Sequence, residues 1–325
     1  MQVSMNLSPN VRNALRQNPS FRHLLVLKRA RQEGFRKAAA RYLTWSQILE
    51  APPSLVGSPG DGSQVEVHIL CCWRDYLCAM WALKTFYRFS PKRYPLAIHI
   101  QGYSTRTMLR RLRTHFPGAR IIVQKEADRA VKQWLSKYKL WRLLAIRKVN
   151  PFMLKLIDFP LFCDTPSMMI LDSDVLFFQE PEELVSRSVA HRPFCFMRDC
   201  GDGYTISLDT ARSEVGIPLA PAVNSGLAIV DRQSVDLRRC DELLSNPKIV
   251  SGNPAWLEQT LFALIASESN QLSYLSDAFL CSLERGRGFA GIAARHYAGN
   301  SRSLMTAEGI SYLIEQGCLR AVRHV

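Results

Sequence analysis

Segments with the apolar pattern of strands alternate with segments with the pattern of helices through the first half of the chain. Residues 65–72, 95–101 and 119–124 have strand patterns, and residues 76–89 and 107–115 between them have helix patterns. This alternation predicts an α/β fold in which a mainly parallel sheet is flanked by helices. Ligands of such folds bind at the carboxyl ends of the strands.

The composition is that of a folded protein with a large excess of positive charge. The chain has 325 residues, 47% of them hydrophobic and 22% charged, and a formal net charge of +14. Such an excess implies an anionic partner: nucleic acid, a membrane surface or a phosphorylated small molecule. No apolar run is long enough to span a bilayer, and the start lacks the apolar core of a secretory signal. We therefore expect a cytoplasmic protein.

The cysteines indicate a reducing compartment. There are nine, an odd number, scattered along the chain and mostly inside apolar runs. This usage is typical of reduced, buried thiols. No Cys-x-x-Cys pair is present, which argues against a structural zinc site.

Composition also divides the chain into three parts. Residues 1–50 form a basic helical extension, with nine Lys or Arg and one acid between Arg12 and Arg41. Residues 51–63 are rich in Pro, Gly and Ser and predict a linker, and residues 64–325 form the main domain. The extension either packs on the main domain with a solvated basic face or contacts a membrane surface or a substrate.

A buried strand that ends in two carboxylates lies near the middle of the chain. Residues 168–178 read Met-Met-Ile-Leu-Asp-Ser-Asp-Val-Leu-Phe-Phe. Side chains alternate along a strand, so Asp172 and Asp174 point to one side and Ser173 to the other. Two carboxylates on one side need partners, of which a divalent cation is the simplest. A strand-end turn with the Asp side chains bonded to the backbone explains the triplet alone equally well.

A basic segment precedes this strand. Residues 128–158 have many Lys and Arg and no acid between the two ends. Pro151 breaks or kinks the helical pattern, so Lys155 belongs to a second helix just before the strand. These cations either form a solvated helix face or include some that face a phosphate group near Asp172 and Asp174.

Several motifs in order along residues 65–302 resemble one family, the metal-dependent glycosyltransferases of the GT-A fold, and most closely the glycogenin-like and galactosyltransferase-like family 8. They are Lys155-Leu156 with residues 169–175 and Glu183-Leu184; residues 224–230, Asn-Ser-Gly-Leu-Ala-Ile-Val; Glu258-Gln259; and residues 296–299, His-Tyr-Ala-Gly. Tyr76 follows the first strand, where the family stacks an aromatic ring on the nucleotide base. One departure is that the family's Lys-Pro-Trp ending is absent, and Arg302 stands where its lysine is expected.

The resemblance implies a GT-A fold and a retaining transfer of sugar from a nucleotide-diphosphate donor, UDP-linked, to an unknown sugar, lipid-linked or protein acceptor. It implies Mn²⁺ or Mg²⁺, and the histidine ligand favours Mn²⁺. The residues that it assigns are Asp172, Asp174 and His296 to the metal; Tyr76, Asp172, Ser173, Lys155, Gly299 and Arg302 to the nucleotide; and Asn224, Glu258, Gln259 and Lys155 to catalysis.

Two other functions are compatible with paired acids or a basic chain. A nucleotidyltransferase also uses paired acids and a metal, but it would show a Gly-rich loop after the first strand, and residues 71–75, Cys-Cys-Trp-Arg-Asp, have no glycine. A nucleic-acid-binding protein would show a known reader motif or an aromatic stacking platform, and neither is present.

Several candidate residues also have purely structural explanations. A late histidine is often a core or surface residue, Asn224 fits a turn cap, and Glu258 fits the first turn of a helix. Tyr76 fits helix packing. Asp199 and Asp202 lie beside glycines and fit a turn, with contact to an acceptor as the alternative.

Overall fold

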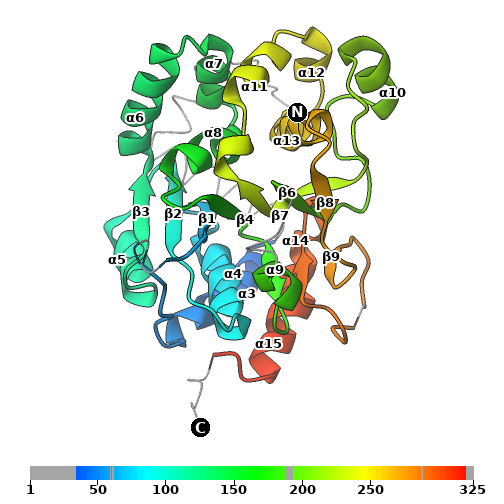
Figure 1. Ribbon diagram of the computed structural model, residues 1–325. Coiled ribbons are helices and arrows are strands. Elements are labelled where there is room, and N and C mark those ends of the chain that lie inside the picture. The colour runs from blue at the N-terminus through cyan, green and yellow to red at the C-terminus, as the bar shows by residue number, and fades with distance from the viewer. Residues whose placement is uncertain (1–33, 59, 61, 187–192, 287, 320–325) are drawn as a thin grey trace, which may run out of the picture.

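A seven-stranded sheet forms the centre of the computed structural model, which describes residues 34–58, 60, 62–186, 193–286 and 288–319 (Figure 1). The strand order is β3-β2-β1-β4-β7-β6-β8, and β7 alone runs antiparallel to its neighbours β4 and β6. The predicted mainly parallel α/β fold is therefore confirmed. The strands are β1 (Val65–Cys72), β2 (Leu96–Gln101), β3 (Arg120–Val123), β4 (Ser167–Leu171), β6 (Phe194–Arg198), β7 (Val223–Asp231) and β8 (Leu272–Tyr274).

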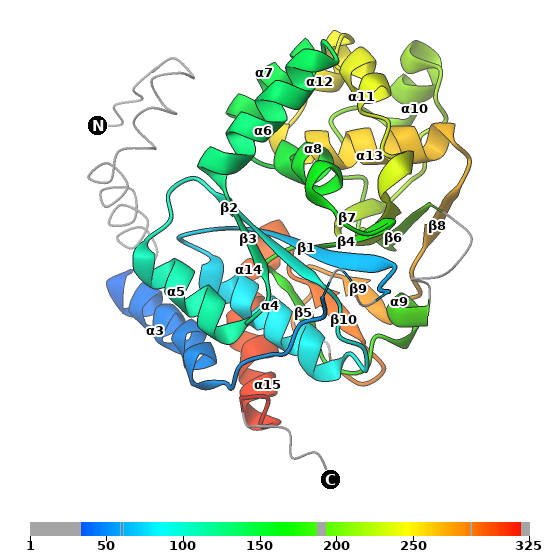
Figure 2. The ribbon, with the colours of Figure 1, turned by 60° about the vertical axis from the view of Figure 1, so that its left-hand side comes forward.

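Helices cover both faces of this sheet (Figure 2). The side chains of β4 alternate between the two layers: Met169 and Leu171 pack on the α4 side, while Met168 and Ile170 pack on the α8 and α13 side. The acidic strand is therefore apolar on both faces until it ends. One layer contains α3 (Phe35–Ser46), α4 (Tyr76–Phe89), α5 (Arg106–His115) and α15 (Ser311–Glu315), and the other contains α6 (Gln124–Lys137), α7 (Trp141–Val149), α8 (Met153–Phe162), α11 (Leu237–Leu243), α12 (Pro247–Ser251) and α13 (Leu257–Glu268).

The basic segment before β4 forms three helices rather than the two that we expected. Pro151 precedes α8 as predicted, and Lys155 lies in α8. A further break comes between α6 and α7, where Lys139 has a φ of 59°, a left-handed conformation that a helix cannot continue.

The acidic strand is also divided. β4 ends at Leu171, residues 172–174 form a turn, and β5 (Val175–Phe177) continues into a second sheet of order β5-β10-β9. This sheet contains β9 (Phe279–Cys281) and β10 (Ala294–His296), and His296 pairs with Val175. The predicted strand therefore ends at the two acids as expected, and the apolar run after them belongs to another sheet, because the chain changes sheets at residues 172–174.

The described part of the basic extension packs on the main domain. The indole of Trp45 in α3 donates to the Thr306 hydroxyl at 2.8 Å, and the Trp81 indole donates to the Trp45 carbonyl at 3.0 Å. Residues 1–33 of the predicted extension lie outside the described residues. Among the described helices, none is both long and apolar enough to cross a membrane.

Much of the predicted linker is hydrogen-bonded to the domain. The Ser54 amide donates to the His115 carbonyl at 2.8 Å, and the Gly57 amide donates to the Tyr94 carbonyl at 2.9 Å. A Cβ on Gly57 would collide with the Arg93 carbonyl. This part of residues 51–63 is therefore fixed to the main domain, and the domain boundaries stay a prediction.

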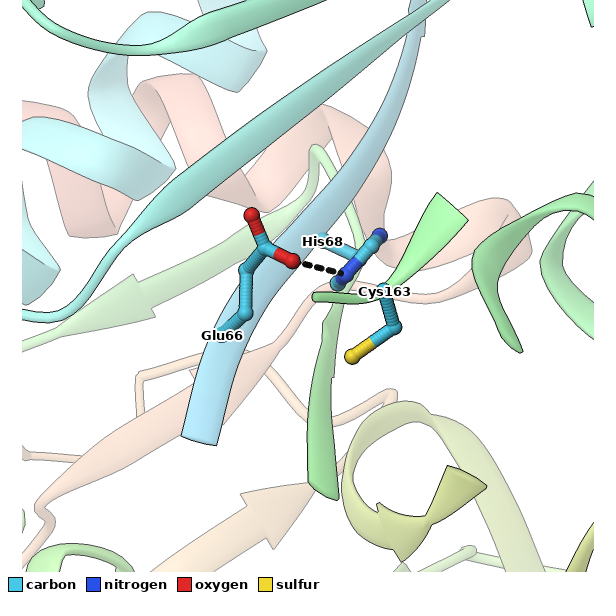
Figure 3. Close-up of side chains that lie close together, drawn as sticks. All are labelled: Glu66, His68 and Cys163. Carbon is cyan, nitrogen blue, oxygen red and sulfur yellow. Dashed lines mark hydrogen bonds and ion pairs between the residues drawn. The ribbon is translucent and has the colours of Figure 1, made fainter. Parts of the chain in front are cut away.

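A buried polar network that includes Glu66 and His68 (Figure 3) ties β1 to its neighbours. Glu66 and His68 lie two residues apart on β1, and His68 Nε2 is 3.2 Å from Glu66 Oε2. Arg120 donates to both Glu66 oxygens, at 2.7 and 2.8 Å. Burial alone would raise the pKa of Glu66, but His68 and Arg120 together lower it to about 2. Glu66 is therefore a buried, ionised group that its partners stabilise.

We expect Glu66→Gln to lower the free energy of unfolding near neutral pH by about 3–5 kcal/mol, because it leaves Arg120 and His68 without their carboxylate. The depressed pKa of Glu66 adds stability above the ordinary value of 4.5 that is lost as the pH falls toward about 2. The variant should therefore lose less stability than the wild type on acidification, measured by urea unfolding at about pH 7 and about pH 3.

Glu242→Gln is the matched control, because Glu242 pairs with Arg239 on the surface. It should change the free energy of unfolding by less than about 1 kcal/mol. Equal effects of the two substitutions would contradict the role given to the Glu66 network.

Candidate functional site

The two carboxylates at the end of β4 meet a histidine from the second sheet. His296 Nε2 lies 3.3 Å from Asp174 Oδ1 and 3.9 Å from Asp172 Oδ2. One ligand atom from each of the three residues lies within 4.8 Å of the others. The convergence follows from the β5–β10 pairing, in which the Tyr297 amide also donates to the Asp174 carbonyl at 2.9 Å. Two carboxylate oxygens and one imidazole nitrogen are ligands that suit Mn²⁺.

Asn224 and Gly226 of β7 fix the histidine ring. Asn224 Oδ1 lies 2.9 Å from His296 Nδ1 and also accepts from the Gly226 amide at 2.9 Å. His296 Nδ1 therefore carries the hydrogen, which leaves Nε2 toward the carboxylates. A Cβ on Gly226 would lie 2.5 Å from His296 Nδ1, so any larger residue would displace the ring.

The charges of this cluster reinforce one another. Burial opposes protonation of His296, yet hydrogen bonding to Asp174 raises the pKa of the histidine well above its ordinary value. Burial also acts to raise the pKa of Asp174, but Arg302 and His296 lower it to about 2. Protonated His296 therefore places its positive charge beside Asp174, at the position that a bound cation would occupy.

Two further cations flank the acidic turn. Lys155 Nζ lies 3.1 Å from Asp172 Oδ1 and 3.3 Å from Glu258 Oε2. Arg302 donates to Ser173 Oγ at 2.7 Å, and its Nε lies 3.5 Å from Asp174 Oδ2. Ser173 thus turns toward Arg302, a contact that the alternation of side chains did not predict.

Glu258 and Gln259, at the start of α13, lie next to Lys155 and Ser225. Glu258 accepts from the Ser225 hydroxyl at 3.0 Å, and Gln259 Oε1 accepts from the Ser225 amide at 3.1 Å. Burial raises the pKa of Glu258 to about 7, although Lys155 acts to lower it. Glu258 Oε1 is buried and has no hydrogen-bond partner, so a polar group of a ligand could bind there.

Tyr76 and Gly299, two of the residues predicted to contact the nucleotide, make no side-chain hydrogen bond to this cluster, although the Gly299 carbonyl accepts from the Arg302 amide. The Tyr76 hydroxyl accepts from Arg111 at 2.6 Å, and its ring packs partly buried against the main core. Gly299 begins a short 3-10 turn with a φ of 54°, and no atom would obstruct a Cβ on it. Positive φ favours glycine there and gives this residue a structural reason.

Three residues of the site were not predicted. Ser225 links Lys155, Glu258 and Gln259, and its position between Asn224 and Gly226 was the available signal. The other two are Asp75, 3.8 Å from Arg302, and Cys281, which accepts from Asn224 at 3.6 Å. Asp199 accepts from Gln259 at 3.2 Å and so does more than shape a turn, and Asp202 accepts from the Ala222 amide, 20 positions along the chain.

Comparison with known proteins finds structural similarity only. No family model matches the sequence, and a search of curated proteins finds no significant match. The galactosyltransferase LgtC, in complex with donor and acceptor sugar analogs, is 16% identical and has a TM-score of 0.49, over 80% of this chain and 98% of that chain. Mouse xyloside xylosyltransferase 1, in its apo form, is 16% identical with a TM-score of 0.47, over 73% and 97%.

A third structure, core-mannan synthase A from Aspergillus fumigatus in a Mn/GDP form, is 11% identical with a TM-score of 0.43, over 70% of this chain and 75% of that chain. At these identities and scores we take neither activity nor ligands from the similarity.

We expect Lys155→Met to lower the free energy of unfolding by about 3–5 kcal/mol, because it leaves Asp172 and buried Glu258 without their shared cation. Lys132→Met on the exposed side of α6 is the control and should change it by less than about 0.5 kcal/mol. Urea unfolding measures both. A Lys155→Met variant as stable as Lys132→Met would show that Lys155 does not offset the charge of these acids.

Proposed function

We propose that this protein is a metal-dependent glycosyltransferase that moves a sugar from a UDP-linked donor to an acceptor. The observation that carries the proposal is the convergence of Asp172, Asp174 and His296 beside two flanking cations. A divalent metal and a diphosphate together match this arrangement, since the acids and histidine can hold the metal while Lys155 and Arg302 face the phosphates.

Breaking the bond between the sugar and the diphosphate leaves negative charge on the β-phosphate. A metal bound by Asp172, Asp174 and His296 would act as a Lewis acid toward that charge. Lys155 and Arg302 supply two more positive charges, and Arg302 can bind two phosphate oxygens at once through its planar guanidinium. Binding of the diphosphate would replace part of their present contact with Asp172 and Asp174.

The groups at the start of α13 suit the sugar. Positive charge grows at the anomeric carbon as the bond breaks, and the unpartnered Oε1 of Glu258 can stabilise it or accept from a sugar hydroxyl. Asn224 and Gln259 would orient the sugar, and Ser225 keeps Glu258 and Gln259 in place. The retaining outcome rests on the family resemblance alone.

The remaining parts of the donor site are also proposals. Tyr76 would stack on the base, with its hydroxyl held by Arg111. Ser173 and Gly299 would border the nucleotide beside Arg302. The acceptor is a sugar, a lipid-linked molecule or a protein.

A screen of nucleotide sugars with Mn²⁺ tests this function. We expect release of UDP from at least one UDP-sugar, and Asp174→Asn should lower the rate by about 100-fold or more because one metal ligand is weakened. Asp209→Asn on the exposed surface is the control and should retain the wild-type rate. Absence of release with every donor, or an Asp174→Asn rate equal to the wild type, would contradict the proposal.

We also propose that the basic extension, residues 1–50, contacts an anionic membrane surface. In its described part, Phe35, Tyr42 and Leu43 are exposed on α3 beside basic residues. Flotation with vesicles containing anionic lipid should recover the full chain and recover less of a Phe35→Ser, Leu43→Ser double variant, which removes two of the exposed apolar side chains. Equal recovery of the two would argue against this contact.

A further inference from the structure

Two thiols and a carboxylate meet beside the candidate site, on segments that are far apart in the sequence. Cys200 follows β6, Cys281 ends β9, and the thiols of both lie near the same oxygen, Asp199 Oδ1, at 3.6 and 3.5 Å. One ligand atom from each of the three lies within 4.8 Å of the others. Cys200 is exposed, whereas the other eight cysteines are buried, so the cluster has a path to solvent.

The buried thiol of Cys281 and the half-buried Asp199 each accept a hydrogen bond from a side chain outside the cluster. The Asn224 amide donates to Cys281 Sγ at 3.6 Å, and the Gln259 amide donates to Asp199 Oδ2 at 3.2 Å. The Cys200 backbone amide donates to Asp199 Oδ1 at 2.8 Å. Donors that support the ligand atoms from behind are a feature of protein metal sites, where they orient the ligands and stabilise their charge.

We propose that Asp199, Cys200 and Cys281 bind a thiophilic divalent cation such as Zn²⁺. Two sulfurs and one carboxylate oxygen are three of the four ligands of a tetrahedral zinc site, and the exposed side leaves the fourth position to water. Sulfur ligands distinguish this site from the harder oxygen and imidazole set of Asp172, Asp174 and His296. Thiols bind a metal as thiolates, so a cation must displace their protons when it binds.

The other cluster with a thiol, Glu66, His68 and Cys163, has its groups already partnered (Figure 3). Arg120 occupies both Glu66 oxygens, and the Cys163 thiol donates to the Thr165 carbonyl at 3.4 Å. All three members are buried, so this cluster offers neither free ligand atoms nor an approach from solvent.

The thiol site is joined to the candidate metal site through Asn224. The amide nitrogen of Asn224 donates to Cys281, and its oxygen holds His296. If the proposed function is right, a cation bound to Cys281 and Asp199 changes the hydrogen bonds that these two residues make. Cys281 accepts from Asn224, which holds His296, and Asp199 accepts from Gln259. Zn²⁺ at the thiol site would therefore alter transfer without competing for Asp172 and Asp174.

Cobalt titration under a phosphine reductant tests the site directly. Co²⁺ bound to thiolates gives a sulfur-to-metal charge-transfer band in the near ultraviolet, which oxygen and imidazole ligands do not give. The wild type should show this band, and excess Zn²⁺ should remove it. Cys200→Ser should abolish the band, whereas Cys318→Ser, which removes a cysteine outside the cluster, should keep it.

The Asp172→Asn, Asp174→Asn double variant separates this proposal from the proposed function. It should retain the band, because it leaves both sulfurs in place, even if no sugar transfer is ever found. A wild type without the band, or a band that persists in Cys200→Ser, would overturn the proposal. So would a disulfide between Cys200 and Cys281, found by peptide mapping of reductant-treated protein.

Discussion

The turn between β4 and β5 concentrates negative charge that the rest of the fold must offset. Asp172 and Asp174 are two residues apart, and Glu258 shares a cation with Asp172. Carboxylates this close repel one another, and burial adds a cost of desolvation. Lys155 and Arg302 offset that charge from helical segments on either side of the turn. Because acids and cations are both gathered at this turn, a metal cation and a diphosphate anion can bind there together. This is the basis of the proposed chemistry.

The change of sheet at this turn explains why residues so distant in sequence meet. β5 leaves the main sheet and pairs with β10, which puts His296 beside Asp174. β7 runs antiparallel to β4 and brings Asn224 and Gly226 against the same histidine. The Gly226 carbonyl also accepts from the Asp172 amide at 2.7 Å. Three strands therefore fix the geometry of the acids and the histidine, and none of them could do so alone.

Local pattern was enough to predict the elements but not the contacts between them. β1 and α4 begin and end where the apolar pattern placed them. Both are almost wholly buried, and the apolar side chains that burial requires are visible in the sequence. The motifs identified Asp172, Asp174 and His296 as a group. That the apolar run after the acids joins a second sheet was not predictable, since β5 is as apolar as β4 and only its pairing with β10 distinguishes it.

The missed residues share the same reason. Ser225 and Cys281 have ordinary local settings, and their roles come from partners between 33 and 82 positions away in the chain. Glu66 and His68 likewise form a network only because β2 and β3 place His99 and Arg120 beside β1. A single sequence gives the residues that form such contacts, but not which of them lie close together in the folded chain.

Titration calorimetry with UDP, in the presence and absence of Mn²⁺, tests the central claim most directly. If Asp172, Asp174 and His296 hold a metal that the diphosphate completes, UDP should bind much more tightly with Mn²⁺ present. His296→Ala should then remove most of the effect of the metal. UDP binding of equal affinity with and without Mn²⁺, or no UDP binding under either condition, would contradict the account.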